Sequence, residues 1–427
     1  MWKKKIKLKE YFVLLLLLFS VVVTVIPSLV SADDPSIDPY VAPGAPDEIT
    51  MDQLFKIGIL DDMNHITGEH AWNGAMLAAR EINEAGGLFI NSTHYYIGLV
   101  AENTFEVEPE LDLDKAIDAA NRMISDNNPH IIMGGFRTDA VIHYIEPIMD
   151  AKIPFICTGA TTDLLTQNVL DNYIRYKYFF RAMLNASKIG GDIINYIPYL
   201  AKTLTGILGK EVTKVGILRE DLEWTVPMAN ALNFYLPLFG LEVVEEIVLP
   251  YDSSEQDLKN AWYQIDNSGA QILVPITSSY MGTLMGRTYG EVQPNCIVCG
   301  INVEAQLDNY WDDTYGGGQY EITTQGTYRT EKTPKTIPFW DNYVSDYSME
   351  PLFTAVCSYD AIYLLYNATS STQSFNADQI VFGLEQINST NTFTGVNGNI
   401  AFTSSHDLLG GPDYVAMLFC QWQEGGT

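Results

Sequence analysis

The sequence contains few cysteines, few basic residues and few histidines, and each shortage argues against a class of protein. Its five cysteines, an odd number in 427 residues, do not suit a disulfide framework. The 24 Lys and Arg residues stand against 53 Asp and Glu, and the net charge of −29 argues against nucleic acid as a partner, because like charges repel. The six histidines have no metal-ligand spacing, and the Gly-x-Ser-x-Gly, His-Glu-x-x-His and Walker motifs are absent. We therefore expect no catalytic centre, no metal and no cofactor.

One cysteine pair has the spacing of a redox or metal site. Cys296 and Cys299 are three residues apart, but they fall in an apolar run that ends at Gly300 and that we interpret as a strand. Side chains three residues apart on a strand point to opposite faces, so the two sulfurs would not converge. We predict that both cysteines belong to a buried core.

The N-terminus carries an export signal. Lysines precede an apolar run from Phe12 to Ile26, and the small residues Val30-Ser31-Ala32 follow as a cleavage pattern. We predict that residues 1–32 are a signal peptide or, because about 20 apolar residues cross a bilayer, an uncleaved membrane anchor. Their removal changes the net charge from −29 to −33, since they carry five Lys and one Glu. The mature protein is expected outside the cytoplasm: extracellular, on the cell surface or periplasmic.

Two further features fit an exported protein. Residues 33–53 contain several prolines among acidic and small residues and predict an extended tether before the fold. Asn-x-Ser/Thr acceptors predict exposed positions that are glycosylated if the host has the machinery, namely Asn91, Asn185, Asn367 and Asn388.

From residue 54 onwards the chain alternates between strand patterns and amphipathic helix patterns. The opening strand Phe55–Asp62 returns as a similar run at Thr213–Asp221, and both are apolar, rich in β-branched residues and followed by a helix pattern. The sequence therefore predicts an α/β fold of two doubly wound parallel-sheet lobes. Ligands of such sheets bind beyond the carboxyl ends of the strands, which fall near Asp61, Glu102, Gly134 and Thr158 in the first lobe.

Short motifs spread from residue 56 to residue 304 resemble one known family. They are Lys56–Leu60, Thr67-Gly68, Asn73–Ala75, Ala79–Gly87, Ile132–Gly135, Ile153–Ile156, Thr158–Thr161 and Gly300–Glu304. Residues 54–424 resemble the extracellular solute-binding proteins of type I periplasmic-binding fold, in the branch of the leucine/isoleucine/valine-binding protein. The resemblance implies lobes joined by a three-crossing hinge, with crossings near residues 182, 328 and 392. Lobe 1 would comprise 54–182 plus 329–392, and lobe 2 would comprise 183–328 plus 393–427.

The resemblance also implies how an amino acid would be held. The ligand carboxylate would meet Gly159, Ala160 and Thr161, together with the Thr138 hydroxyl. The same Thr158–Thr162 loop is also suited to capping the following helix, and a helix N-terminus is itself an anion site. The ammonium would meet Glu304, with Asn302 beside it; the alternative is that Glu304 is a solvated carboxylate.

Other side chains are candidates for the walls of the site. Trp224 and Tyr280 follow strands of the second lobe and are expected to close over the ligand, unless they are core residues. Asp62 and Arg137 are expected on the first-lobe wall, where Arg137 either binds a carboxylate or forms a surface salt bridge. Arg137 and Trp224 depart from the usual pattern of the family, so the identity of the ligand's side chain stays open.

The resemblance implies a non-catalytic protein that delivers an amino acid or a similar small polar zwitterion to an ABC permease in the membrane. We expect it to act as a monomer. Two alternatives remain at this point: the ligand-sensing ectodomain of a membrane receptor, which uses the same fold, and a secreted α/β hydrolase. The hydrolase is disfavoured because the sequence shows no nucleophile with its base.

Overall fold

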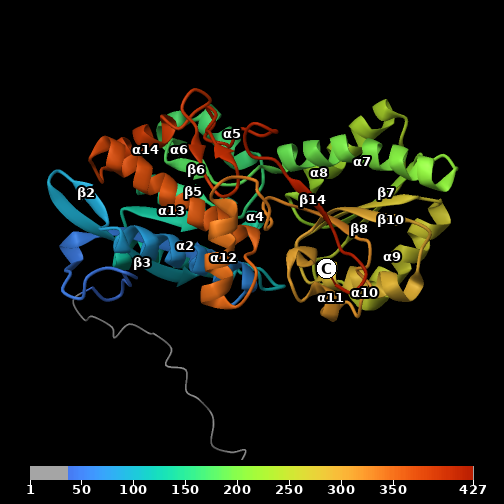
Figure 1. Cartoon of the computed structure of the whole chain (residues 1–427), viewed down its shortest axis with the longest axis horizontal. Helices are drawn as coiled ribbons and strands as arrows, with labels where there is room; N and C mark the ends of the chain where they lie inside the picture. The colour runs from blue at the N-terminus through green and yellow to red at the C-terminus, as the bar shows by residue number, and fades with distance from the viewer. Residues whose placement is uncertain (1–36, 427) are drawn as a thin grey trace, which may run out of the picture.

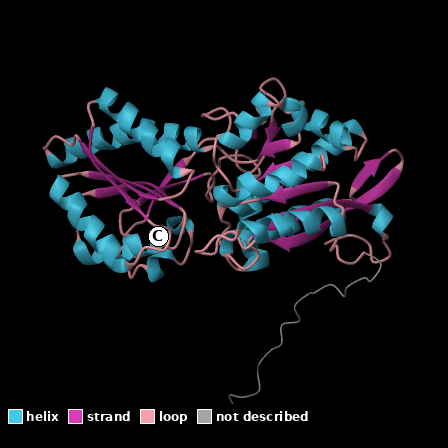
Figure 2. Cartoon of the chain, turned by 180° about the vertical axis from the view of Figure 1, so that it is seen from behind, coloured by secondary structure: helices cyan, strands magenta, loops and turns pink. Residues whose placement is uncertain are grey.

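Two six-stranded sheets, one in each lobe, organise the chain. The computed structural model describes residues 37–426 and shows the lobes side by side along the long axis of the molecule (Figure 1). Helices flank each sheet (Figure 2). The predicted α/β architecture of two lobes is thereby confirmed. The predicted signal peptide or anchor lies outside the described residues, and within them no helix is both long and apolar enough to cross a bilayer.

The first sheet has the strand order β2-β3-β1-β4-β5-β6, and all its neighbours pair in parallel except β2 with β3. Its strands are β1 (Leu54–Asp61), β2 (Leu88–Ile90), β3 (Thr93–Asn103), β4 (Ile131–Gly134), β5 (Phe155–Cys157) and β6 (Phe179–Arg181). The helices of this lobe are α2 (Ile66–Glu84), α3 (Leu113–Arg122), α4 (Thr138–Asp150), α5 (Leu164–Asp171), α6 (Tyr173–Tyr176), α12 (Thr336–Tyr347), α13 (Phe353–Thr372) and α14 (Ala377–Glu385).

The second sheet has the order β14-β11-β10-β9-β7-β8, and β14 is its antiparallel edge. Its strands are β7 (Lys214–Glu220), β8 (Glu242–Leu249), β9 (Ile272–Thr277), β10 (Ile297–Asn302), β11 (Ile322–Gln325) and β14 (Leu418–Gln421). The helices are α7 (Ala186–Leu208), α8 (Thr225–Tyr235), α9 (Glu255–Ser268), α10 (Met281–Val292) and α11 (Tyr310–Asp313). A separate pair, β12 (Phe393–Thr394) and β13 (Asn399–Ile400), lies near the junction.

The first helix begins earlier than expected. We predicted a start near His70, but α2 starts at Ile66, because the His65 ring accepts a hydrogen bond from the Thr67 N–H and caps the helix. The same helix crosses α13 at close range. A Cβ at Gly74 would lie 2.1 Å from the Ala355 carbonyl oxygen, so only glycine permits this approach.

The prediction of an extended tether is wrong for residues 37–53, which are the part of that segment that the structure describes. Ile37, Tyr40 and Ile49 are buried against the first lobe. Val41 exchanges two backbone hydrogen bonds with Leu99, of 2.9 and 2.8 Å, and thus adds to the edge of the sheet. The composition-based prediction failed because these few apolar side chains, spaced among the prolines, are sufficient to hold the segment on the lobe.

The boundary expected at residue 392 is also wrong. The His406 ring stacks on Phe180 of β6 at 4.0 Å, and Phe402 packs edge-on against the Phe180 ring at 5.0 Å, so the chain still contacts the first lobe beyond residue 392. The chain joins the second sheet only at β14. The third crossing therefore falls just before residue 418, and Lys332 is bound there, its ammonium donating to the carbonyl oxygens of Gly326 and Ala416.

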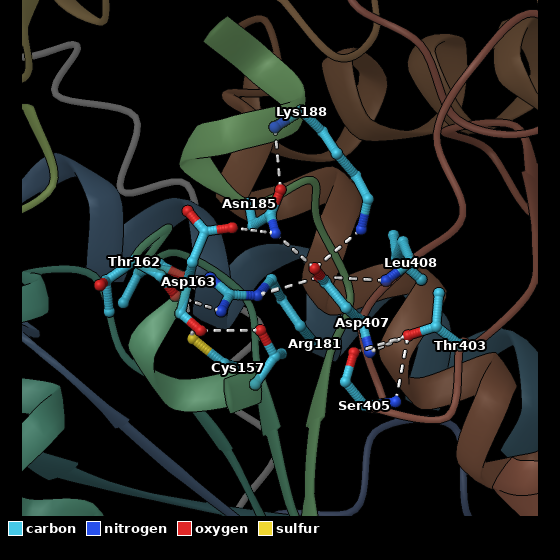
Figure 3. A network of polar contacts seen from close by, with 12 residues as sticks. Cys157, Thr162, Asp163, Arg181, Asn185, Lys188, Thr403, Ser405, Asp407 and Leu408 are labelled. Carbon is cyan, nitrogen blue, oxygen red and sulfur yellow. Dashed lines mark hydrogen bonds and ion pairs between the residues drawn. The ribbon is translucent and has the colours of Figure 1, made fainter. Parts of the chain in front are cut away.

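A buried ion pair sits where the chain first leaves the first lobe (Figure 3). The Arg181 side chain is fully buried, and its Nε lies 3.3 Å from Asp407 Oδ1. Its two terminal nitrogens donate to the carbonyl oxygens of Ala160 and Thr162. Asp407 also accepts from Lys188 and from Asn185. Arg181 therefore fixes the loop after β5 by binding two carbonyl groups of that loop. Asn185, which we predicted to be an exposed glycan acceptor, is buried beside this ion pair.

We expect Arg181→Met to lower the free energy of unfolding by about 3–5 kcal/mol, because it leaves the carbonyl groups of Ala160 and Thr162 without their donor and removes the fully buried cation beside Asp407. Urea denaturation measures this loss. The control is Lys188→Met, which removes a partly exposed partner of the same carboxylate but leaves Arg181 with both carbonyl groups, so it should cost clearly less than Arg181→Met. Equal losses in the two variants would contradict the assigned role of Arg181.

A second prediction concerns the carboxyl group of Asp61 at the end of β1. Burial raises its pKa to about 7, and the charge of Asp62 adds to this rise, while hydrogen bonds from backbone N–H groups oppose it. Because the folded state holds this proton more tightly than the unfolded chain, its stabilising contribution is complete below about pH 4 and is lost as the pH rises through about 7.

Asp61→Asn should therefore flatten the fall in unfolding free energy between pH 4 and pH 8, since Oδ2 has no hydrogen-bond partner among the described residues and an amide fits there. Chemical denaturation at several pH values measures this slope. Asp47→Asn, on an exposed position, is the matched control and should retain the slope of the parent protein. An unaltered slope in Asp61→Asn would refute this prediction.

Candidate functional site

A cavity that is partly open to solvent lies between the lobes at the carboxyl ends of the strands, with about 790 Å³ of empty space when the open solvent at its mouth is counted. Most of its lining is apolar and comes from both lobes and from the crossing segments: Phe136, Met183, Leu184, Ile189, Leu222, Trp224, Ile301, Val303, Phe353, Val415 and Met417. The polar lining side chains are few: Arg137, Thr138, Thr161, Tyr251, Ser278, Gln306, Cys357 and Asn397. An enclosed apolar space with a few placed polar groups is the usual form of a small-molecule site.

The first-lobe wall is built where the parallel strands β4 and β5 end side by side. Thr138 begins α4, and Thr161 lies in the loop after β5. The loops meet closely, because a Cβ at Gly159 would lie 2.5 Å from the Gly135 carbonyl oxygen. The Thr138 and Thr161 side chains are more than nine-tenths buried, line the cavity, and form no hydrogen bond with any described residue. Two hydroxyl donors and the start of a helix are therefore available to an anion.

Arg137 lies beside these hydroxyls and supplies a positive charge. Its Nη1 donates to the carbonyl oxygen of Glu108 at 3.1 Å, and its Nε lies 3.7 Å from Asp139. The guanidinium stacks over the Tyr251 ring of the second lobe at 4.8 Å. The Tyr251 hydroxyl in turn donates to the Val107 carbonyl oxygen at 3.2 Å, so the lobes contact each other at the rim of the cavity.

The second-lobe wall has Trp224, which is only 6% exposed, and Ser278 after β9. Beneath Ser278 lies the fully buried carboxylate of Glu220. It accepts hydrogen bonds from the backbone N–H and the hydroxyl of both Ser278 and Ser279. Burial raises the pKa of Glu220, and these four donors oppose the rise. Glu220 therefore positions the loop after β9 and has no capacity left for a ligand.

Five of the predicted site residues line this cavity: Arg137, Thr138, Gly159, Thr161 and Trp224. Three others lie elsewhere. Ala160 is buried and faces Arg181 through its carbonyl group. Asp62 accepts hydrogen bonds from the N–H groups of Asn64 and Val107 within the first lobe. Tyr280 is 56% exposed and contacts Arg287 at the surface.

The predicted ammonium partners, Asn302 and Glu304, are not among the residues that line the cavity. Asn302 is fully buried and donates to Glu321 at 2.9 Å. After it the chain enters a 3₁₀ turn, η4 (Glu304–Gln306), which brings Val303 and Gln306 to the cavity while Glu304 accepts from the Thr283 hydroxyl at 2.9 Å. Burial raises the pKa of Glu304, and the charges of nearby carboxylates, that of Glu220 foremost, raise it further.

Sequence reasoning missed the residues that make up most of the lining. Tyr251 follows β8 and Ser278 follows β9, so the strand-end rule that selected Thr138 could have found them in the second lobe. The apolar residues Val415 and Met417 come from the third crossing, whose position the sequence did not reveal. Cys357 lines the cavity as a free thiol, and burial raises its pKa, which keeps it protonated and unreactive.

All five cysteines, Cys296 and Cys299 included, are free thiols. Across residues 37–426 no cluster of three or more His, Cys, Asp or Glu side chains has an arrangement that could hold a metal ion.

The chain resembles known proteins over most of its length. The sequence profile of the periplasmic binding protein family matches residues 55–427. A Leu/Ile/Val-binding protein homolog 7 from Brucella suis is 21% identical over 370 residues, which cover 84% of this chain and 86% of the relative.

Solved structures share the fold. The branched-chain amino acid transporter substrate-binding protein LivJ of Streptococcus pneumoniae, in complex with isoleucine, has a TM-score of 0.68 at 18% identity and covers 86% of this chain and 99% of its own. A solute-binding protein of an ABC transporter from R. palustris, in complex with benzoate, has a TM-score of 0.68 at 14% identity and covers 87% of this chain and 98% of its own. Together with the two-lobed fold and the cavity between the lobes, the match over residues 55–427 shows that this chain belongs to the periplasmic binding protein family.

Proposed function

We propose that this protein is the extracytoplasmic solute-binding component of an ABC importer, and that it captures a small organic carboxylate between its lobes. The observation that carries the proposal is the pair of hydroxyls, Thr138 and Thr161, which line a cavity between the lobes and have no hydrogen-bond partner among the described residues. A carboxylate bound in this cavity would accept a charge-assisted hydrogen bond from each of the two hydroxyls.

The same wall supplies the other requirements of a carboxylate. Arg137 provides a positive charge, and α4 begins at Thr138, so the partial positive charge of a helix N-terminus lies beside the cavity. Gly159 keeps the two loops close enough for the hydroxyls to act together. Trp224 and Phe136 would enclose the apolar part of the solute from opposite lobes.

The ligands of structural neighbours support a small carboxylate as the ligand, but they do not decide which one it is. Structural neighbours were solved with leucine, isoleucine, benzoate and 4-hydroxybenzoate, and a carboxylate is common to all of these ligands. An amino acid, as the sequence resemblance implied, is one candidate. Membership of the periplasmic binding protein family and the likeness to a transporter's substrate-binding protein support delivery to a membrane permease and a non-catalytic role.

The proposal is tested by a thermal-shift screen of the purified, ligand-stripped protein against a panel of small carboxylates that includes amino acids and aromatic acids. A ligand at 100 times its Kd should stabilise the folded state by about 2.7 kcal/mol, because it binds only that state. Calorimetric titration of the hits then measures the affinity. A panel without any stabilising carboxylate would overturn the proposal.

Replacing both hydroxyls should weaken binding without altering the shape of the cavity. The two single variants Thr138→Val and Thr161→Val each remove one charge-assisted hydrogen bond to the ligand. Each should raise the Kd of the best carboxylate by about 10-fold or more, since such bonds contribute about 1.5–3 kcal/mol. The matched control is Thr203→Val on the exposed face of α7. An affinity in the two cavity variants equal to that of the control would show that the carboxylate binds elsewhere.

A further inference from the structure

We infer that the natural ligand of this cavity is an apolar carboxylate without a positively charged group, such as a branched aliphatic or an aromatic acid, and not a zwitterionic amino acid. The inference rests on the proposed function and narrows its ligand. It starts from the charges of the lining: among the described residues, no Asp or Glu side chain lines the cavity, whereas Arg137 does.

Three carboxylates that do not line the cavity, those of Glu220, Asp360 and Glu304, accept hydrogen bonds from groups of the protein. Glu220 accepts from two backbone N–H groups and two hydroxyls. Asp360 accepts from the N–H groups of Val396 and Asn397, and Glu304 accepts from Thr283 on α10. A ligand ammonium would therefore meet no carboxylate in the lining of the cavity, and a buried charge without a counter-charge costs several kcal/mol.

The crossing segments add donors instead of acceptors. The side-chain oxygen of Asn397 accepts from the Thr327 hydroxyl at 3.0 Å and from the Lys332 ammonium at 3.3 Å, which fixes its orientation. The amide nitrogen of Asn397 is left as its free polar group, and it is a donor. Lys332 itself is a partly buried cation that contacts Asn397 at this wall. These groups favour a negative ligand and repel a positive one.

The second lobe offers one neutral acceptor. The side-chain oxygen of Gln306 is buried and has no hydrogen-bond partner among the described residues, while its amide nitrogen donates to the Thr324 carbonyl oxygen at 2.9 Å. A single amide oxygen can accept from a hydroxyl or an N–H of the ligand, but it does not neutralise an ammonium ion. The remaining lining is apolar and suits a hydrocarbon body.

Three ligands that share a phenyl group test the effects of the ligand's carboxylate and ammonium on binding separately. 3-Phenylpropionate carries the carboxylate alone, phenylalanine carries both charges, and phenethylamine carries the ammonium alone. Calorimetric titration of the purified chain should give a Kd for 3-phenylpropionate at least 10-fold lower than that for phenylalanine, and no heat with phenethylamine. The pair 4-methylpentanoate and leucine repeats the comparison with an aliphatic body and should show the same order.

The results distinguish a failure of this inference about the ligand's charge from a failure of the proposed function. Equal or tighter binding of phenylalanine or leucine than of the matched acid would overturn this inference and leave the proposed function intact. The variant Glu304→Gln gives an independent reading: the Kd of the better acid should change less than twofold, whereas a zwitterion held by Glu304 would lose its binding. Failure of both acids and both amino acids to bind would overturn the inference and would also count against the proposed function.

Discussion

The structure depends on one constraint, namely that charged groups near the junction of the lobes are removed from water and must each find partners within the protein. Arg181 meets Asp407 and two loop carbonyl groups, and Glu220 meets the donors of two serines. Because these groups are satisfied by backbone atoms, they fix the conformation of the loops that end the strands. The shape of the site is thus set by buried charges that do not themselves face the ligand.

The two lobes present different surfaces to the cavity. The first lobe presents Arg137 and the donors Thr138 and Thr161, while the second lobe presents mainly apolar surface with Trp224 and Tyr251. The lobes already contact each other where Arg137 stacks on Tyr251. Closure of a hinge around a solute would therefore bring an apolar wall against a wall that binds anions, which removes the solute from water and strengthens its polar contacts.

The sequence predicted the parts of this structure that depend on local pattern. The strands that open the two lobes are found as β1 and β7, and Thr138, Gly159 and Thr161 lie together because neighbouring parallel strands end at the same edge. The direction of Glu304 could not be predicted, since it depends on a single 3₁₀ turn after β10. Likewise, residues 37–53 and 393–415 are placed by a few aromatic and aliphatic contacts across long sequence separations, which no periodic pattern encodes.

The central claim is that a carboxylate binds against the ends of β4 and β5 while its apolar body fills the space between the lobes. A crystal structure of the protein with 3-phenylpropionate tests this most directly. The account predicts carboxylate oxygens within hydrogen-bond distance of the Thr138 and Thr161 hydroxyls, and a phenyl ring packed between Phe136 and Trp224. A ligand whose carboxylate lies away from both hydroxyls would contradict it.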